Sequence, residues 1–427
     1  MKNGCTRGRT ALFMLLTTTL LAVSGTISGA VAEGLTIDEA IRIALQNNIA
    51  LQAQRQTIAV AEGELRSART FRNNPRLELA GAAGTESNEA REDVRNFSAK
   101  FSQEFELGGQ RRWRTRAAMA ALEQTRWEVQ DAQRELVKEV KETFYRLVFL
   151  EEKLAFADQA MDLAQQLLRI AEERYRAGDR PQLDVNLALV ELQNVVRQRD
   201  EARRQWRQAR FTLNRLLGRP VDAELVVSST LDAPPLTLDH GQWRQQALQQ
   251  RPDLQGRSAT VEAAMGELGL AKAERVPDLE VGFVFERQVT GERVERTFGG
   301  SIAFALPLWN RRRGEIEAAQ ARMRAAELRR TALQQSVETE VATALAEVEQ
   351  LRTAVQLYQE TILPQSRENL TLLRQVFAAG EVGIVPLVTE QRAFIAINNE
   401  YLETWLAYHV ALATLESAAG VSLAHQR

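Results

Sequence analysis

The sequence repeats its own landmarks at a fixed spacing, and this internal duplication constrains the fold more than any other feature. The landmarks are turn-forming residues in three pairs, each 202 positions apart: Pro75 and Pro277, Gly178 and Gly380, and Gly218 and Gly420. Chance similarity between helices rich in alanine and glutamate does not place such residues in matching positions. The sequence therefore predicts two copies of one structural unit.

Each copy is predicted to contain a helix, two strands, a very long helix, a turn and a returning helix, a mainly α fold with a small β part. The first repeat covers 33–218, with elements at 38–72, 76–84, 96–107, 113–176 and 183–217. The second covers 241–420, with elements at 242–273, 278–287, 297–308, 314–378 and 387–418. A proline-rich connector, 219–240, joins the repeats, and 421–427 form a tail.

Residues 1–32 are typical of a secretory signal peptide. Basic residues precede the short apolar segment 11–25, and small residues stand before an expected cleavage point after Ala32. An uncleaved membrane anchor is the alternative, but about 15 apolar residues fall short of the about 20 that span a bilayer. Cleavage removes Cys5, the single cysteine, so the exported chain is expected to have no disulfide bond.

Apolar residues in the two long helices recur at alternating spacings of four and three. The repeat runs from Leu136 to Tyr175 in the first helix and from Val337 to Ile362 in the second. This period of 3.5 indicates helices packed side by side as coiled coils. Pro364 is expected to kink the second helix. A helix of about 64 residues spans roughly 96 Å, so a tall, thin protein is expected; a solid coiled-coil rod remains an alternative to a tube.

The four predicted strands alternate apolar and polar side chains. The apolar positions include Phe97, Phe101, Phe283, Phe285 and Phe304. Stretches of about ten alternating residues are typical of membrane β-barrels, with apolar side chains toward lipid, but half-buried soluble sheets alternate in the same way. Four strands cannot close a barrel, and open edges are excluded from hydrocarbon. Two copies would supply eight strands and a filled interior, whereas three would supply twelve and a water-filled lumen.

Aromatic and basic residues follow the strand ends, as suits the head-group level of a membrane. These candidate membrane-interface residues are Trp113, Arg111, Arg112, Trp309, Arg311 and Arg312. Solvated helix starts are the alternative interpretation of the arginines.

No catalytic, cofactor-binding or metal-binding motif is present in the sequence. The three histidines are scattered, and the exported chain keeps no cysteine, so clustered ligands for a soft metal are not expected. The formal charge of −2 argues against a nucleic-acid binder. We therefore expect neither an enzyme nor a tight metal site.

The duplicated unit, the junctions ELGGQRR and LPLWNRRRGEIEAA, and the turns ERYRAGDRPQLDV and VFAAGEVGIVPLVTEQR resemble the TolC-like outer-membrane efflux proteins. The junctions are most similar to the cobalt–zinc–cadmium resistance branch. The resemblance covers about residues 35–423. It implies a homotrimer with a twelve-stranded transmembrane barrel, continued by a long α-helical barrel in the periplasm. It also implies a periplasmic adaptor protein and an inner-membrane pump of the RND type as partners.

The same resemblance assigns roles to residues in the two turns. The adaptor-docking tips would be Arg176, Ala177, Gly178 and Leu183, together with Ala379, Gly380 and Leu387. Asp184 and, less directly, Glu390 would narrow the periplasmic entrance. Many members of the metal branch carry a lipidated N-terminal cysteine, and this chain departs from that pattern.

The expected function is a passive outer-membrane exit duct for heavy-metal cations in a tripartite efflux system. One alternative keeps the duct but changes the cargo to drugs or to secreted proteins. Another alternative, of a different class, is a soluble periplasmic coiled-coil scaffold, in which the strands would face water.

Overall fold

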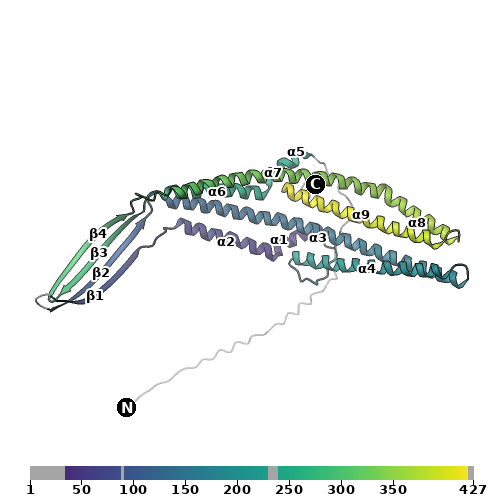
Figure 1. Cartoon of the computed structure of the whole chain (residues 1–427), viewed down its shortest axis with the longest axis horizontal. Helices are drawn as coiled ribbons and strands as arrows, with labels where there is room; N and C mark the ends of the chain where they lie inside the picture. The colour runs from purple at the N-terminus through teal and green to yellow at the C-terminus, as the bar shows by residue number, and fades with distance from the viewer. Residues whose placement is uncertain (1–33, 88–90, 229–238, 422–427) are drawn as a thin grey trace, which may run out of the picture. The chain divides into compact units, whose positions relative to one another are not determined.

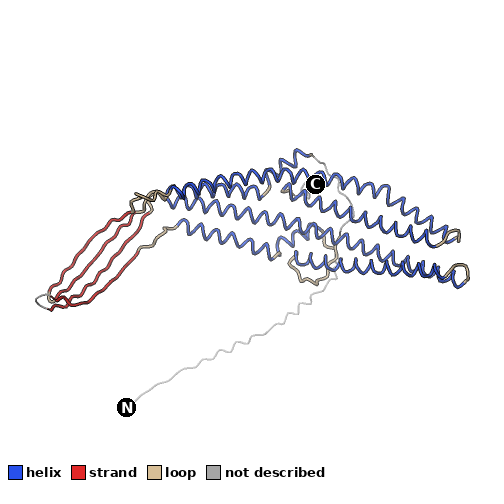
Figure 2. The backbone as a smooth tube through the Cα atoms, viewed as in Figure 1, coloured by secondary structure: helices blue, strands red, loops and turns tan. Residues whose placement is uncertain are grey.

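A computed structural model describes residues 34–87, 91–228 and 239–421 of the chain. The predicted signal peptide, most of the C-terminal tail and residues 229–238 of the connector lie outside the described residues. Within the described part, most residues are helical and the strands form one sheet (Figure 2).

The two halves of the chain contain the same order of elements, as the duplication predicts (Figure 1). The first half has α1 (Ile37–Asn47), α2 (Ile49–Arg69), β1 (Arg76–Ser87), β2 (Arg91–Phe105), α3 (Gln110–Arg176) and α4 (Gln182–Leu216). The second half has α5 (His240–Gln250), α6 (Pro252–Ala273), β3 (Leu279–Thr290), β4 (Arg293–Phe304), α7 (Arg313–Leu357), a π-helical turn (Tyr358–Ile362), α8 (Leu363–Ala378) and α9 (Ile384–Ala419).

The first helix of each repeat is broken in two, which corrects the continuous helices expected from the sequence. Asn48 has an extended backbone, and its side chain accepts a hydrogen bond from the N–H of Leu51, so it ends α1 and begins α2. Its amide also donates to the carbonyl of Leu216 in α4, at 3.0 Å. In the second repeat Pro252 disfavours a helical backbone at Arg251, and α6 starts at the proline.

The second long helix contains an irregular turn where Pro364 was expected to disturb it. Residues Tyr358–Ile362 form a π-helical turn directly before α8, whereas α3 runs unbroken for 67 residues. Pro364 has no N–H to donate to the preceding turn, so a locally widened helix is a physically reasonable response.

The strands reach further toward the hairpin turns than the sequence pattern suggested. β1 extends to Ser87, β2 starts at Arg91 and β4 starts at Arg293. Polar residues hide the alternation near these turns, but backbone pairing continues there because the antiparallel ladder does not depend on apolar side chains. At the other end, β4 stops at Phe304, before the expected 308.

The largest core cluster lies where the short helices α1 and α5 pack beside the long ones. It includes Phe144 and Leu147 of α3, Leu213 of α4, and Trp405 and Tyr408 of α9, each at most 1% exposed. The heptad positions Val337, Val341, Ala344, Val348 and Val355 of α7 are also buried, which confirms the predicted packing face. Among the described residues, no helix combines the length and apolarity needed to cross a membrane.

Small residues bring α3 and α6 close together beside the sheet. A β-carbon on Gly266 would lie 2.8 Å from the backbone of Ala117, and one on Gly269 would lie 2.2 Å from the ring of Trp113. Trp113 is therefore packed in the seam between the two helices and is only partly exposed.

Candidate functional site

The sheet is a four-stranded antiparallel meander in the order β1-β2-β3-β4. Its outer strands, β1 and β4, each have one edge that pairs with no strand of the described chain. Unpaired edges expose a row of backbone donors and acceptors, so a further strand is needed to complete the ladder on each side.

The register places the alternating apolar residues of all four strands on one face. Leu77, Phe101 and Phe283 form one cross-strand row. Toward the hairpin turns, the next row is Leu79, Ala99, Phe285 and Phe298. Toward the helices, the next row is Gln103, Val281 and Ile302, and the last is Phe105, Leu279 and Phe304. Most of the large apolar side chains on this face are exposed in the single chain: Phe298 is 80% exposed and Ile302 is 71% exposed. So large an apolar surface indicates contact with lipid or a partner.

The apolar rows extend from Phe105 to Phe97 along β2. Eight residue steps at about 3.4 Å cover roughly 27 Å, which suits the apolar band of about 25 Å on an outer-membrane barrel. In the cross-strand row of Phe97, β3 and β4 already carry Arg287 and Arg296, and Arg95 follows on β2, so the apolar band ends at a basic rim.

The opposite, polar face of the sheet is acidic toward the helices. Glu104 of β2 and Glu280 of β3 are cross-strand neighbours there, and Asp278 immediately precedes β3. Burial raises the pKa of Asp278, and the nearby charges of Glu104 and Glu106 raise it further. The Gln110 amide donates to the Asp278 carboxylate at 2.8 Å. The carboxylates are therefore close enough to influence one another.

At each strand-to-helix junction, the residue directly before the long helix has a left-handed backbone conformation. Gly109, with φ of 76°, precedes α3, and Arg312, with φ of 53°, precedes α7. Arg312 is held by the Asn310 side chain, which accepts from its N–H at 3.0 Å, and by an ion pair with Glu274. These contacts fix a backbone conformation that is unfavourable for a non-glycine residue.

The predicted membrane-interface residues occupy different surroundings. Trp309 is 91% exposed, and Arg311 is exposed beside it. Arg111 lies over the ring of Phe71, at 4.7 Å from its centroid, and Arg112 is exposed on the next position of α3. Trp113, in contrast, points into the seam with α6.

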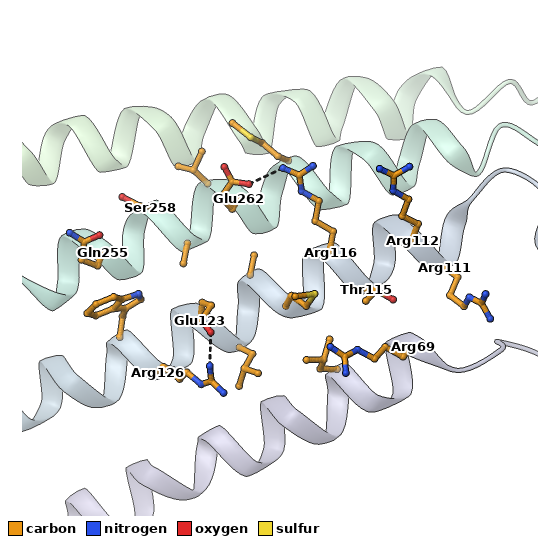
Figure 3. Close-up of a pocket in the computed structure, with 18 of the residues that line it drawn as sticks. Arg69, Arg111, Arg112, Thr115, Arg116, Glu123, Arg126, Gln255, Ser258 and Glu262 are labelled. Atoms are coloured by element: carbon orange, nitrogen blue, oxygen red, sulfur yellow. Dashed lines mark hydrogen bonds and ion pairs between the residues drawn. The ribbon is translucent and has the colours of Figure 1, made fainter.

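A cavity of about 1190 Å³ lies over α2, α3 and α6, next to the first junction (Figure 3). Its walls combine apolar side chains such as Leu65, Phe71 and Met119 with six arginines and three glutamates. The arginines are Arg69, Arg111, Arg112, Arg116, Arg126 and Arg330. No sequence motif indicated this cavity, because its residues come from helices far apart in the chain.

The two helical turns opposite the sheet form the predicted tips. Gly178 and Gly380 adopt left-handed backbones, with φ of 76° and 83°, at matching places in the two repeats. The tips are tied together, because Arg174 donates to the Phe377 carbonyl at 2.9 Å and Arg180 donates to the Gly380 carbonyl at 3.2 Å. The sequence did not reveal these arginine contacts, which join the repeats.

The exposed apolar residue of the second tip is not the one that the resemblance assigned. Leu183 is 61% exposed at the first tip, but Leu387 is only 5% exposed and belongs to a core cluster with Ile384. Val385 is 58% exposed and lies 202 residues after Leu183, the repeat spacing. Applying that spacing at the tip would have identified Val385.

The other tip residues are accessible in different degrees. Arg176, Ala177 and Ala379 are exposed, whereas Asp184 and Glu390 are half-buried. Farther along the same helices, Arg392 of α9 pairs with Glu191 of α4 at 2.5 Å, and the Glu191 side chain is 3% exposed. This ion pair is a further link between the repeats.

Within the described ranges, no group of three or more histidine, cysteine, aspartate or glutamate side chains is arranged to hold a metal ion. The described residues instead form an apolar sheet face, two unpaired strand edges, a basic cavity and a pair of helical tips.

Comparison with known proteins identifies the family. The profile of the family described as "Outer membrane efflux protein" matches residues 40–219 and 243–421. The chain is 24% identical to the cobalt-zinc-cadmium resistance protein CzcC of Cupriavidus metallidurans over 90% of both chains. It is 27% identical to the pyoverdine export outer membrane protein OpmQ of Pseudomonas putida, over 76% of this chain and 70% of that protein.

Solved structures share the fold. CusC superposes with a TM-score of 0.74 at 19% identity, covering 90% of this chain and 92% of CusC. The outer membrane channel CmeC of Campylobacter jejuni gives a TM-score of 0.75 at 14% identity, covering 90% and 85%. Channels of this family form trimers and work with adaptor proteins and RND pumps.

The duplicated helices, the four-stranded meander with its exposed apolar face and the family match agree with one another. The family match replaces the alternative of a soluble periplasmic scaffold, and the members of this family are channels rather than enzymes. The chain belongs to the outer membrane efflux protein family and is an outer-membrane efflux channel of a Gram-negative bacterium with a helical periplasmic part.

Proposed function

We propose that three copies of this chain form the exit duct of a tripartite efflux system, with a twelve-stranded barrel and a twelve-helix periplasmic tunnel. The observation that carries this proposal is the meander with two unpaired edges and an exposed apolar face. In a meander of four strands β1 and β4 run in opposite directions, so β4 of one copy can pair antiparallel with β1 of the next. Three copies are the smallest ring with an open lumen.

The two tips are the proposed docking surface for a periplasmic adaptor protein. Leu183 and Val385 supply exposed apolar contacts at equivalent places in the two repeats. Arg176, Ala177, Gly178, Ala379 and Gly380 supply the surrounding turn surface. In this proposal Leu387 supports the tip from its core. An inner-membrane pump of the RND type would energise transport, since a duct of this kind supplies only a path.

Heavy-metal cations are the proposed cargo. The similarity to CzcC, a cobalt-zinc-cadmium resistance protein, supports this assignment. The acidic polar face of the sheet, with Glu104, Asp278 and Glu280, also supports it, because this face would line the lumen of the barrel. The second candidate is an organic cargo, supported by the similarity to OpmQ, a pyoverdine export protein.

Deletion of the gene and complementation with the intact chain test the cargo. We expect the deletion strain to become sensitive to cobalt, zinc or cadmium salts and the complemented strain to recover. Unchanged metal tolerance, together with retention of an organic compound inside the deletion strain, would contradict the metal assignment and leave the duct in place.

Asp184 and Glu390 are proposed to narrow the periplasmic entrance. Both are half-buried near the tips, where a ring of three chains would bring copies together. We expect Asp184→Ala to lower the cation preference of single channels in planar bilayers, because an acidic ring attracts cations. Asp179→Ala, at an exposed position in the first turn, is the matched control. Equal cation preference in the Asp184 variant and in the intact protein would remove Asp184 from the entrance.

A further inference from the structure

The arginine-rich cavity beside the sheet has a charge imbalance. Its three carboxylates already have partners: Glu262 pairs with Arg116 at 3.1 Å, Glu123 pairs with Arg126 at 2.6 Å, and Glu106 pairs with Arg114 at 2.6 Å. Across the part of the chain that the structure describes, the remaining lining arginines have no carboxylate within ion-pair distance. They are Arg69, Arg111, Arg112 and Arg330. The cavity therefore offers uncompensated positive charge to an anion.

Three of these arginines lie at the end of the cavity nearest the sheet. Arg111 and Arg112 are in the first turn of α3, and Arg69 is the last residue of α2 (Figure 3). The apolar band of β2 ends at Phe105, five residues before α3 begins. The arginines are thus located just beyond the apolar band, at the level expected for lipid head groups.

The cavity opens on the same side of the protein as the apolar face of the sheet. In Figure 3 the sheet end of the helices is to the right, with α6 above α3 and α2 below it. When this view is turned so that the sheet end points upward, α2 lies to the right of α3 and α6 lies to the left. In β2 the apolar side chains are on odd-numbered residues. The carbonyl of Asp93, also an odd-numbered residue, points toward β3, because it accepts from the N–H of Gly291, just after β3. The stereochemistry of L-residues then puts β3 on the left and β1 on the right when the apolar face is viewed with the hairpins upward. The two left-to-right orders agree, so both surfaces face the same side.

The walls of the cavity are suited to an amphiphile. Phe71, Met119 and Leu122 lie beside the arginines. Arginine forms planar, charge-assisted hydrogen bonds with phosphate oxygens, and basic pockets near membrane level bind anionic lipid head groups. The helices beside the sheet pack in the order α2, α3, α6 and α7. In the proposed ring, neighbouring copies therefore meet at the outer flanks of α2 and α7, and the cavity between α2, α3 and α6 stays open toward the membrane.

We propose that this cavity binds the head group of an anionic phospholipid from the periplasmic leaflet, with the phosphate held by Arg69, Arg111 and Arg112. This inference rests on the proposed barrel, because the barrel sets the level of the membrane. The lipid would fix the height of the channel in the bilayer and stabilise the junction between sheet and helices.

Lipid retention by the purified full-length channel tests the proposal. The channel is reconstituted in nanodiscs of phosphatidylethanolamine with a minor fraction of phosphatidylglycerol, then washed, and retained lipids are quantified by mass spectrometry. We expect phosphatidylglycerol to be enriched about fivefold or more over its bulk fraction. A variant with Arg69→Gln, Arg111→Gln and Arg112→Gln should return to the bulk fraction.

The matched control removes the same charge far from the cavity, with Arg169→Gln, Arg203→Gln and Arg207→Gln on exposed positions of α3 and α4. It should retain the full enrichment. Equal loss in both variants would assign the effect to net charge and overturn the site, as would absence of enrichment in the intact protein. If inorganic phosphate binds the intact channel in phosphatidylethanolamine discs and no lipid is enriched, the occupant is a free anion and the lipid assignment fails.

Channel conductance separates this inference from the proposed duct. An intact channel that conducts ions but enriches no anionic lipid would refute the lipid site alone. A protein that forms no conducting trimer would refute the duct. If the triple variant yields no folded trimer, the single variants Arg111→Gln and Arg112→Gln each provide the comparison, and each should lose part of the enrichment.

Discussion

At the scale of single residues, a few polar contacts between distant positions link the two repeats, in addition to the apolar core that both repeats share. Arg174 and Arg180 of the first repeat donate to carbonyls of the second tip. The buried carboxylate of Glu191 is satisfied by Arg392 from the other repeat, at 2.5 Å. A buried carboxylate that loses its partner retains a desolvation cost, so these contacts matter more than surface ion pairs.

Replacing Arg392 tests this link. We expect Arg392→Met to destabilise the packing of α4 on α9 by about 1–3 kcal/mol, because Glu191 would stay buried without a partner. The double variant Glu191→Gln with Arg392→Met should recover most of that loss. Hydrogen exchange of α4 and α9 amides is the measurement, and unchanged exchange in the Arg392 variant would contradict the account.

Asp278 provides a pH-dependent test at the same scale. Its pKa is raised in the folded chain by burial and by Glu104 and Glu106, so protonation favours the folded state. The ionised carboxylate therefore destabilises the fold at neutral pH, and this cost disappears as the pH falls. We expect Asp278→Asn to raise the thermal unfolding temperature at neutral pH and to have little effect at acidic pH, in unfolding curves of the purified channel.

The control is Glu317→Gln, which removes a charge from an exposed position of α7. It should change the unfolding temperature little at either pH. If Asp278→Asn changes the unfolding temperature equally at neutral and acidic pH, ionisation of the Asp278 carboxylate does not destabilise the fold.

At the scale of elements, the sheet shows how far sequence pattern reaches. Alternation at Phe101 and Phe283 predicted the strands, and the register puts these residues side by side on one face. The strand ends near Ser87 and Arg293 could not be predicted, because polar residues there carry no alternating signal. The pattern also could not decide between lipid and water, since both environments select one apolar face.

Helix interruptions and the cavity illustrate the same limit. Pro252 signals the start of α6, whereas the matching break at Asn48 is also held by a hydrogen bond to the Leu216 carbonyl that only the fold creates. The positions of the tips could be predicted from the repeat spacing, but the burial of Leu387 depends on its packing against neighbouring helices. The cavity unites Arg69 with Arg112 and Glu262, which no local window of sequence contains.

Charge placed on the two faces of β3 tests the lipid contact. Phe283 lies on the apolar face and is 63% exposed in the single chain, whereas Val284 lies on the polar face. We expect Phe283→Arg to destabilise the inserted channel by about 2–4 kcal/mol and Val284→Arg to be tolerated. Heat resistance of the trimer on gel electrophoresis is the measurement. Greater sensitivity to the change at Val284 would mean that the faces are assigned the wrong way round.

At the scale of the whole molecule, the described part of one chain leaves the outer edges of its sheet without a partner strand. Its helices have a buried core of their own, centred on residues such as Trp405 and Phe144, so the helical part can fold within a chain. Its sheet has no such core and has two free edges. Assembly is therefore required by the sheet, and the number of copies follows from the lumen that transport requires.

Cysteine cross-linking between strand edges tests this central claim most directly. The one native cysteine, Cys5, is in the predicted signal peptide, so introduced thiols in the exported chain have no native competitor. Ala80→Cys in β1 is combined in turn with Thr297→Cys, Gly299→Cys or Ser301→Cys in β4. Within one chain β1 and β4 are separated by two strands, roughly 14 Å, too far for a disulfide. On oxidation in the outer membrane, we predict a covalent species of three chain masses for at least one pair, with nothing larger; cross-linking that stops at two chains, or that continues beyond three, would contradict the trimeric duct.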